Sequence, residues 1–447
     1  MAIARRRALL LGAAALSVAL TATACGSSDS KDSGGAQPAS AADLQAALDT
    51  GGSITVWAWE PTLQKVVTDF QAKYPKVTVK LVNAGTNKDE YTALQNAVKA
   101  GKGVPDLAQI EYYALPQFTL AKSVADLTAF GADQLNSTFT PGPWGSVQAG
   151  AKGVYGLPMD SGPMALFYNK EVFDKYKIAV PTTWDEYLAA AKKLHAADPK
   201  AYLASDTGDA GFATSMIWQA GGKPYTVDGT QVGVNFDEAG TKKFTAAWQQ
   251  LVSGKLLSPV TAWSDAWYQG LGDGSIASLV TGAWMPGPLE SGVKGGTGKW
   301  RVAPMPQWQS GAKVTAENGG SSLALTEASA NKKLAYAFLQ YATVDAGAQS
   351  RVDAGAFPAT TKQLNSPAFL DKQDPYFGNQ KINQVLAQSA TQVAPGWSYL
   401  PFQVYANSVF NDTVGKAYVS GTTLDSGLKA WQEASLKYAK DQGFTVK

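Results

Sequence analysis

The alternation of apolar and polar positions changes its period several times after residue 50. Short runs rich in β-branched and aromatic residues indicate strands, and stretches with apolar side chains at helical spacing indicate helices. We predict strand 54–59, helix 61–74, strand 77–82, helix 89–100 and strand 107–110. This order is typical of a parallel sheet with right-handed crossovers, so the sequence predicts an α/β fold.

The ends of two of these strands carry candidate ligand-binding side chains. Trp59 and Glu60 end the first strand, and Glu111, Tyr112 and Tyr113 follow the third. The carboxyl ends of parallel strands meet at one edge of the sheet, where α/β proteins usually bind ligands. We therefore expect these residues to lie close together at a ligand site.

The stretch from Gly153 to Lys170 combines two strand-like runs with a break between them. Residues 158–163 are too rich in Gly and Pro for regular strand pairing, and they contain one carboxylate, Asp160. Such a passage suits a hinge crossing between two lobes beside a ligand cleft. An ordinary bend with a solvated Asp160 is the alternative.

The rest of the chain predicts two lobes built from discontinuous segments. A strand over 274–280 is expected to return to the first lobe, and residues 281–287 break it into a helix start. We assign residues 51–160 and about 275–340 to lobe 1, and about 161–274 and 341–447 to lobe 2. The remaining predicted helices cover 181–195, 210–220, 239–252, 331–342, 346–352, 382–388, 405–419 and 424–440, and the remaining strands cover 300–303 and 322–325.

Residues 1–25 have the features of a bacterial export signal. Arginines at positions 5–7 precede an apolar run over 8–20 that is too short to span a bilayer, and small residues lead to Cys25. This arrangement resembles a lipobox, in which Cys25 would carry a lipid and begin the mature chain. Plain secretion with a spare thiol is the alternative. Residues 26 to about 42 are expected to form a disordered tether, and the residues from there to 50 a short lead-in to the folded part.

Composition narrows the range of possible chemistries. The 447 residues include 13 Trp and 18 Tyr but one His and one Cys, and the formal net charge is +2. A nearly neutral, scattered charge gives no electrostatic footprint for nucleic acid. Metal centres and histidine-based nucleophilic catalysis need imidazole or thiolate groups, so we expect no metal, no cofactor and no catalytic residue.

Aromatic residues in predicted loops favour a sugar site. The C–H groups of a pyranose form an apolar face that packs on an aromatic ring, and its hydroxyl groups need paired donors and acceptors once buried. Trp59 and Tyr112 adjoin carboxylates, and Trp284 and Trp397 lie in Gly- and Pro-rich breaks. Each ring alone could be a core residue, but together they favour sugar binding.

Several motifs occur in a characteristic order over nearly all of the mature chain. They are Val104-Pro105-Asp106, Tyr155-Gly156-Leu157-Pro158, Ala165-Leu166-Phe167-Tyr168-Asn169-Lys170, Pro181-Thr182-Thr183-Trp184-Asp185-Glu186, and residues 319–325 followed by Asn331-Lys332-Lys333. In this order they resemble the extracellular solute-binding proteins of carbohydrate ABC importers, the group that includes maltose-binding protein. The resemblance implies a two-lobed periplasmic-binding-protein fold that closes over a carbohydrate and delivers it to ABC permease subunits. It also implies a monomeric, non-enzymatic protein that is lipid-anchored to the outer face of a bacterial cell membrane.

The family pattern also indicates which residues touch the sugar. They follow the first and third strands, the Tyr-Gly-Leu-Pro segment and the returning strand. In this chain these positions are Trp59, Glu60, Glu111, Tyr112, Asp160 and Trp284. Looser correspondences add Phe212, Trp218, Phe357 and Trp397, and Met285 and Gly320 complete the candidate set.

Two alternative functions stay open from the sequence. A secreted glycoside hydrolase needs two carboxyl groups about 5 Å or about 6.5–9.5 Å apart, and Asp160 with Glu60 or Glu111 could supply them. A receptor for a peptide or another polar solute could use the same fold. The number of aromatic residues favours a di- or oligosaccharide as the ligand, but the sequence does not name the sugar.

Overall fold

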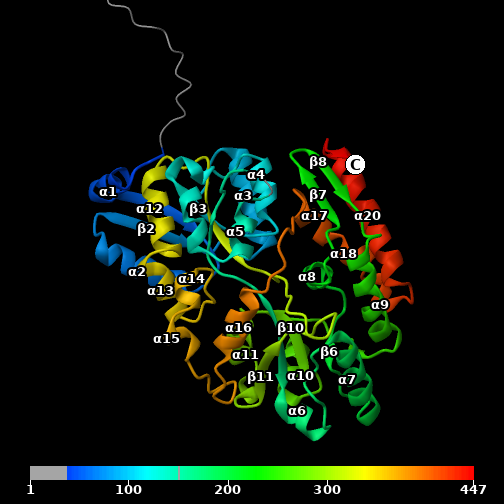
Figure 1. Ribbon diagram of the computed structural model, residues 1–447. Coiled ribbons are helices and arrows are strands. Elements are labelled where there is room, and N and C mark those ends of the chain that lie inside the picture. The colour runs from blue at the N-terminus through cyan, green and yellow to red at the C-terminus, as the bar shows by residue number, and fades with distance from the viewer. Residues whose placement is uncertain (1–37, 150–151) are drawn as a thin grey trace, which may run out of the picture. The chain divides into compact units, whose positions relative to one another are not determined.

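The first sheet of the fold has five strands. In the computed structural model, which describes residues 38–149 and 152–447, their order is β2-β1-β3-β12-β4 (Figure 1). The strands are β1 (Gly52–Trp57), β2 (Val77–Val82), β3 (Leu107–Glu111), β4 (Leu157–Pro158) and β12 (Ser321–Leu325). As predicted, β1 pairs in parallel with β2 and β3 through the crossover helices α2 (Leu63–Lys73) and α3 (Lys88–Ala100). β12 is antiparallel to both of its neighbours.

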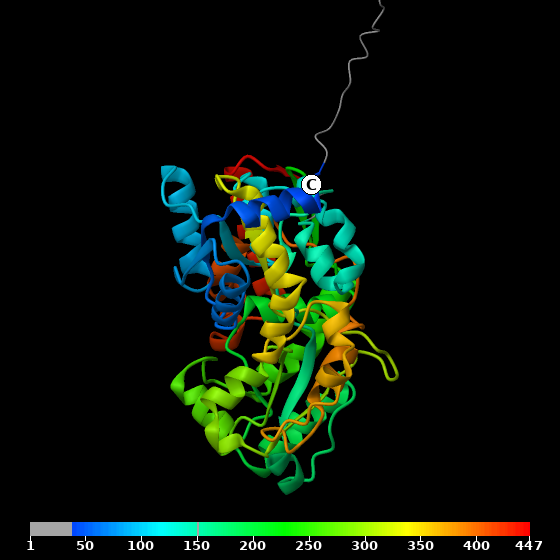
Figure 2. The ribbon, with the colours of Figure 1, turned by 90° about the vertical axis from the view of Figure 1, so that its left-hand side faces the viewer.

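Helices that are distant in the sequence pack together on this part of the fold. α1 (Ala41–Thr50) packs against α12 (Lys332–Thr343), and α13 (Ala346–Asp353) packs against α2 (Figure 2). α1 begins at a capping box formed by Ser40 and Asp43. The predicted tether is therefore wrong for residues 41 and 42, which begin this helix, and its part up to residue 37 lies outside the described residues.

A second sheet has three antiparallel strands in the order β10-β5-β11. They are β5 (Met164–Asn169), β10 (Ser278–Gly282) and β11 (Trp300–Pro304). The prediction that the strand over 274–280 returns to the first lobe is wrong, because β10 pairs with β5 and not with a strand of the first sheet. Its apolar run suits a buried strand in either sheet, so the local pattern could not select the partner.

The remaining elements surround these sheets or form small sheets of their own. β7 (Tyr225–Asp228), β8 (Gln231–Val234) and β13 (Thr445–Val446) form one small sheet, and β6 (Ala204–Ser205) pairs with β9 (Leu257–Ser258). The helices not yet named are α4 (Leu115–Leu120), η1 (Leu127–Phe130), η2 (Ala132–Thr138), α5 (Pro141–Val147), α6 (Lys170–Lys175), α7 (Trp184–Ala197), α8 (Ala210–Gln219), α9 (Ala239–Ser253), α10 (Asp265–Asp273), α11 (Pro286–Gly292), η3 (Lys294–Gly296), α14 (Thr361–Leu364), α15 (Pro367–Leu370), α16 (Ile382–Ala390), α17 (Gln403–Ser408), α18 (Phe410–Thr413), α19 (Lys416–Val419) and α20 (Leu424–Asp441). The single helix predicted over 405–419 is thus three short helices, and α10 was not predicted.

The buried apolar side chains form separate clusters around the two sheets. One cluster surrounds the first sheet, and two others pack around the second sheet and its helices. We call the first sheet with its cluster the first lobe, and the second sheet with its two clusters the second lobe. The chain passes from β4 to β5 between the lobes defined in this way. Two further segments run beside it, because Pro163 forms a β-bridge with Glu317 and Asp160 forms one with Pro358.

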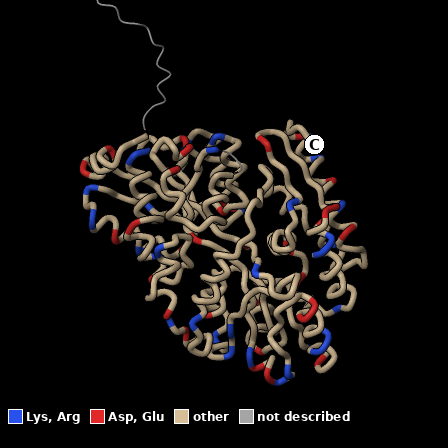
Figure 3. Tube along the Cα trace, in the orientation of Figure 1, with Lys and Arg blue, Asp and Glu red and all other residues tan. Residues whose placement is uncertain are grey.

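Positively and negatively charged residues are interspersed along the described part of the chain (Figure 3). Among the helices of the described residues, none combines the length and the apolar content that crossing a membrane requires.

Candidate functional site

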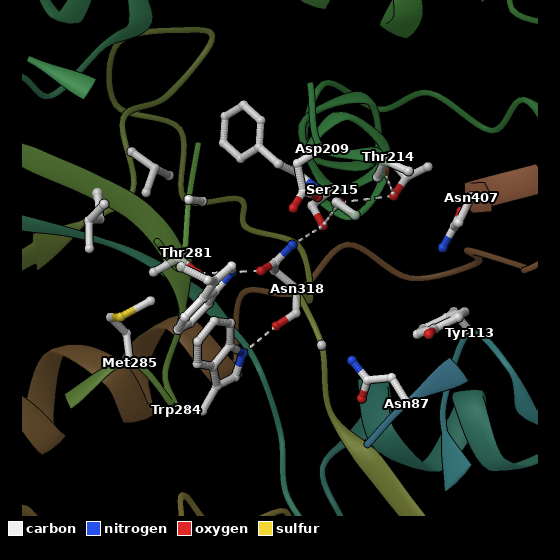
Figure 4. A pocket seen from close by; sticks show the side chains of 18 of the residues that line it. Asn87, Tyr113, Asp209, Thr214, Ser215, Thr281, Trp284, Met285, Asn318 and Asn407 are labelled. Carbon is white, nitrogen blue, oxygen red and sulfur yellow. Dashed lines mark hydrogen bonds between the residues drawn. The ribbon is translucent and has the colours of Figure 1, made fainter. Parts of the chain in front are cut away.

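A cavity of about 940 Å³ is lined by residues of both lobes. Its lining includes residues at the carboxyl ends of β1 and β3, Asp160 in the crossing, the start of α8, and the segments around Trp284 and Asn318. Figure 4 shows part of this lining, with Tyr113 on one side and Ser215, Trp284 and Asn318 on the other. The predicted edge of the parallel sheet therefore faces this cavity. The volume lies near the upper end of the range of about 300–1,000 Å³ that is typical of small-molecule sites.

Gln109 on β3 organises the wall from the first lobe. Its side-chain oxygen accepts hydrogen bonds from the backbone N–H groups of Trp59 and Glu60, both at 3.1 Å, and its amide nitrogen donates to Ser321 Oγ at 3.2 Å. Gln109 is buried, and these bonds satisfy its amide. They hold the loop that carries Trp59 and Glu60 against two strands of the sheet.

Two carboxyl groups of this wall have protein partners. Glu60 pairs with the buried Arg351 of α13, whose Nε lies 3.1 Å from Glu60 Oε2. Glu111 Oε2 accepts a hydrogen bond from the Tyr91 hydroxyl at 2.9 Å. Burial raises the pKa of Glu111 to about 7. The two acids are therefore held in place before any ligand arrives.

Two further acids lie on adjacent crossing segments. Asp160 Oδ1 accepts a hydrogen bond from the backbone N–H of Ser321 at 2.6 Å, and its backbone oxygen accepts one from the Tyr112 hydroxyl at 2.6 Å. Glu317 is buried, and its Oε2 accepts a hydrogen bond from the backbone N–H of Gly162 at 2.6 Å. Burial raises the pKa of Asp160 to about 6 and that of Glu317 to about 7. The acids thus join the crossing segments to each other.

Hydrogen bonds through Asn318 build the wall from the second lobe (Figure 4). Trp284 Nε1 donates to the backbone oxygen of Asn318 at 2.7 Å, and Asn318 Nδ2 donates to Ser215 Oγ at 3.3 Å. Thr281 Oγ1 donates to Asn318 Oδ1 at 3.4 Å. Ser215 stands on α8, which Asp209 caps through a hydrogen bond from the backbone N–H at its third position. The wall therefore presents an indole ring beside amide, hydroxyl and carboxylate groups.

Gly319 and Gly320 let the segment after Asn318 pass between two aromatic rings. Their φ angles are +80° and +97°. A Cβ atom at Gly320 would lie 2.5 Å from Tyr112 Cε2, and one at Gly319 would lie 2.9 Å from Trp284 Nε1. Only glycine fits both the backbone conformation and the space at these positions.

Asp206 forms another polar corner of the lining. Its Oδ2 accepts hydrogen bonds from Trp248 Nε1 and the Tyr418 hydroxyl, both at 2.8 Å. Burial raises the pKa of Asp206 to about 6. Asn407 and Asn411 also belong to the lining. Within the described residues, no group of three or more His, Cys, Asp or Glu side chains is arranged to hold a metal ion.

The cavity brings together most of the residues predicted from the sequence. Its lining contains Trp59, Glu60, Glu111, Asp160, Phe212, Trp284, Met285 and Gly320. It does not include Tyr112, Trp218, Phe357 and Trp397. The predicted lipidation site, Cys25, lies outside the described residues.

Of the predicted residues outside the lining, Tyr112, Trp218 and Phe357 are buried, and Trp397 is partly buried against the second lobe's apolar cluster. Tyr112 is buried against Gly320, behind the wall. Trp218 stacks on Trp397 with their ring centroids 5.0 Å apart, and Phe357 is buried in the second lobe. An aromatic residue in a loop or on an amphipathic helix has the same local pattern whether it faces a core or a cavity.

Sequence reasoning also missed several residues of the lining. Gln109, Asn318, Asn407 and Asn411 are uncharged amides, and nothing in their spacing sets them apart from surface amides. Trp263 could have been found, because it lies in a loop after a proline, as Trp284 lies in a Gly- and Pro-rich break.

Comparison with known proteins gives the family of this chain. Residues 58–349 match the family model described as bacterial extracellular solute-binding protein. A lactose-binding protein from Rhizobium radiobacter is 26% identical over 407 residues, which cover 86% of this chain and 92% of that protein.

Two solved structures have the same two-lobed fold, which confirms the predicted fold class. An ABC-transporter-associated binding protein from B. animalis subsp. lactis Bl-04, in complex with β-1,6-galactobiose, is 46% identical with a TM-score of 0.80, covering 88% of this chain and 99% of that one. The second is the galacto-N-biose-/lacto-N-biose I-binding protein of the ABC transporter from Bifidobacterium longum, in complex with lacto-N-biose. It is 28% identical to this chain with a TM-score of 0.78, and the match covers 89% of this chain and 99% of that protein. This chain belongs to the family of bacterial extracellular solute-binding proteins.

Proposed function

We propose that this chain is the saccharide-binding component of an ABC importer, with a di- or oligosaccharide as its ligand. The observation that carries the proposal is a single cavity in which both lobes contribute aromatic rings and hydrogen-bonding groups. Trp59 and Tyr113 belong to the first lobe, and Phe212 and Trp284 belong to the second. Rings supply faces for the C–H groups of a pyranose, and the amides and acids beside them suit its hydroxyl groups.

Galactose-containing disaccharides are the first ligands to consider. The names or complexes of the three relatives refer to lactose, β-1,6-galactobiose and lacto-N-biose. Each of these saccharides contains a β-linked galactosyl unit. The relatives are described as binding proteins, which also favours capture over catalysis.

The contacts of the carboxyl groups favour binding over glycoside hydrolysis. Glu60 is paired with Arg351, Glu111 accepts a hydrogen bond from Tyr91, and Asp160 accepts one from a backbone N–H group. In a hydrolase, one acid must give its proton to the leaving oxygen while the other stays free to attack or to activate water. Acids that are already bound to the protein are better suited to fixing the walls of a cavity.

Capture by lobe closure follows from the two-sided lining. Each lobe offers half of the contacts, so a saccharide gains its full set only when both lobes reach it, and binding favours the closed state. A micromolar dissociation constant corresponds to about −8 kcal/mol. A few ring contacts and charge-assisted hydrogen bonds can supply this free energy after the cost of closure. Release to the permease then requires that the transporter favour the open state.

We also propose limits for the two lobes. The first comprises about residues 41–158 and 321–353, and the second about 164–317 and 357–447. The pairing of β10 with β5 and the packing of α12 and α13 near α1 and α2 support these limits. They differ from those expected from the sequence by moving about residues 275–317 to the second lobe and 341–353 to the first.

The site of action is proposed to be the outer face of a bacterial cell membrane, with a monomer anchored through a lipid on Cys25. The positive, apolar and small-residue segments of positions 5–25 support this anchoring. Mass spectrometry of the mature N-terminus tests it: a lipid-modified Cys25 is expected, and an unmodified cleavage product would contradict it.

Titration calorimetry of the chain from Gly26 onward tests the proposed function. The panel contains lactose, β-1,6-galactobiose, lacto-N-biose, maltose and an arabinose disaccharide, and chromatography checks each mixture for cleavage. We expect the wild-type chain to bind at least one intact galactose-containing saccharide saturably. Trp284→Ala should weaken this binding at least tenfold. The control Val419→Ala, at an exposed position outside the lining, should leave it unchanged. Absence of binding to every saccharide, or release of monosaccharides, would overturn the proposal.

A further inference from the structure

Trp263 lies in an unusual position for a tryptophan. It belongs to the loop between β9 and α10, lines the cavity and exposes 50% of its surface. Large apolar side chains are usually buried, and a single exposed one often needs no explanation. The backbone and the neighbouring rings of Trp263 make this case different.

The backbone of Trp263 adopts a strained conformation. Its φ angle is +67°, in the left-handed region that bulky side chains rarely enter. Hydrogen bonds of the next residue, Ser264, hold the Trp263 backbone in this conformation. Ser264 Oγ donates a hydrogen bond to the backbone oxygen of Thr261 at 2.7 Å, and it caps α10 by accepting one from the backbone N–H of Trp267. Strained residues that persist in this way cluster at ligand-binding sites.

Neighbouring rings fix the direction of the Trp263 indole. It stacks on Trp284 with ring centroids 5.7 Å apart and planes 29° apart, and it also contacts Trp267 at 5.1 Å. Both neighbours are held by their own N–H groups, since Trp284 binds the Asn318 backbone oxygen and Trp267 binds Ser205 Oγ at 2.9 Å. Trp263 is therefore the exposed ring of an aromatic group in which Trp284 and Trp267 are tied to the protein by hydrogen bonds.

We propose that Trp263 is the stacking face for the outer unit of a saccharide of two or more units, and that it makes the site select such saccharides over monosaccharides. This inference rests on the proposed function. The hydrogen-bonded groups around Asn318 and Ser215 lie beside Trp284, are less exposed than Trp263, and suit the hydroxyl groups of the inner unit. A cavity of about 940 Å³ leaves room for a second unit, and the half-exposed indole offers it an apolar face.

The variant Trp263→Asn separates the ring from the backbone conformation. Asparagine enters the left-handed region more readily than tryptophan, so the loop keeps its shape while the stacking face is lost. Calorimetry measures β-1,6-galactobiose directly, and competition against it measures galactose. We expect the affinity for galactobiose to fall at least tenfold, which corresponds to a loss of about 1.4 kcal/mol in binding free energy. The affinity for galactose should change less than twofold. The unfolding temperature should equal that of the wild type or exceed it.

Two further variants complete the test. Trp263→Phe keeps a flat apolar face and should recover most of the galactobiose affinity, and Leu120→Ala, at an exposed position outside the lining, should change neither affinity. An unchanged galactobiose affinity in Trp263→Asn, or equal losses for galactobiose and galactose, would overturn the inference while the proposed function stands. If the wild-type chain binds no saccharide, the proposed function fails and the inference fails with it.

Discussion

At the scale of single residues, Glu317 shows how a buried acid contributes to this fold. Its two carboxylate oxygens accept hydrogen bonds from Ser161 Oγ at 2.9 Å and the Gly162 N–H at 2.6 Å. Burial nevertheless raises its pKa from 4.5 to about 7, and the nearby Asp160 acts in the same direction. Between about pH 4.5 and about pH 7, the folded chain therefore keeps at Glu317 a proton that the unfolded chain releases.

The variant Glu317→Gln should flatten the pH dependence of stability. A raised pKa in the folded state means that the free energy of unfolding falls as the pH rises from about 4.5 through about 7. A glutamine amide can accept from Gly162 and donate to Ser161, and it carries no charge. We expect the variant to resemble the wild type at pH 5 and to exceed its free energy of unfolding by about 1–3 kcal/mol at pH 8.

Denaturant unfolding of both proteins at pH 5 and pH 8 provides this measurement. Glu433→Gln, at an exposed position on α20, serves as the control and should follow the wild-type profile. A Glu317→Gln variant that is less stable than the wild type at both pH values would contradict the role given to the buried carboxyl.

Residues selected from the sequence lie in the cavity lining where chemistry and topology agreed. Trp59, Glu60 and Glu111 were found because the end of a parallel strand is a defined place in space. Asp160 was found because a carboxylate in a Gly- and Pro-rich crossing is distinctive. Trp218, Phe357 and Trp397 were chosen on looser grounds, and they lie outside the lining because tertiary packing decides which way a ring faces.

At the scale of elements, two crossing segments contact each other through the backbone groups of Gly162. The N–H of Gly162 donates to Glu317, and its carbonyl oxygen accepts a hydrogen bond from the Asn318 N–H at 2.8 Å. A Cβ atom at Gly162 would overlap the backbone oxygen of Asn318. The absence of a side chain therefore allows two crossing segments to lie in direct contact.

Gly162→Ala should destabilise the fold and weaken saccharide binding. The added methyl group must push the segment carrying Asn318 away, and overpacking of this kind costs about 1–3 kcal/mol. That segment also holds Trp284, so its displacement disturbs the cavity. Thermal unfolding and calorimetry with β-1,6-galactobiose measure the two effects.

Gly145→Ala is the matched control for this substitution. Gly145 lies in α5, no atom lies within 4 Å of a Cβ built there, and alanine is favoured over glycine in helices by about 0.5–1 kcal/mol. We expect equal or higher stability and unchanged binding for the control. Equal behaviour of Gly162→Ala and Gly145→Ala would contradict the role of close contact at the crossing.

Helices and strands whose apolar residues recur at a clear helical or strand spacing were predicted correctly. The strands with which they pair in the sheets were predicted less well. The parallel strands and crossover helices at the start of the chain were right because adjacent βαβ units fix their own neighbours. β10 was placed in the wrong lobe because an antiparallel partner far along the chain leaves no local signal. α1 was taken as lead-in, since it is short and buries little apolar surface of its own.

At the scale of the whole molecule, the separate cores explain how a cavity between lobes can form. Each lobe packs its own apolar side chains around its own sheet, and the crossing segments join them. Lobes of this kind can move as units, because few core contacts need to break. The polar and aromatic groups left between them are available to a ligand.

A crystal structure of the chain from Gly26 onward, grown with β-1,6-galactobiose, tests the central claim most directly. We predict an intact disaccharide in the cavity, with one unit beside Trp284 and Asn318, the other against Trp263, and contacts to Trp59 or Tyr113 from the first lobe. A disaccharide that is bound elsewhere, that touches one lobe only, or that is cleaved would contradict capture between two lobes.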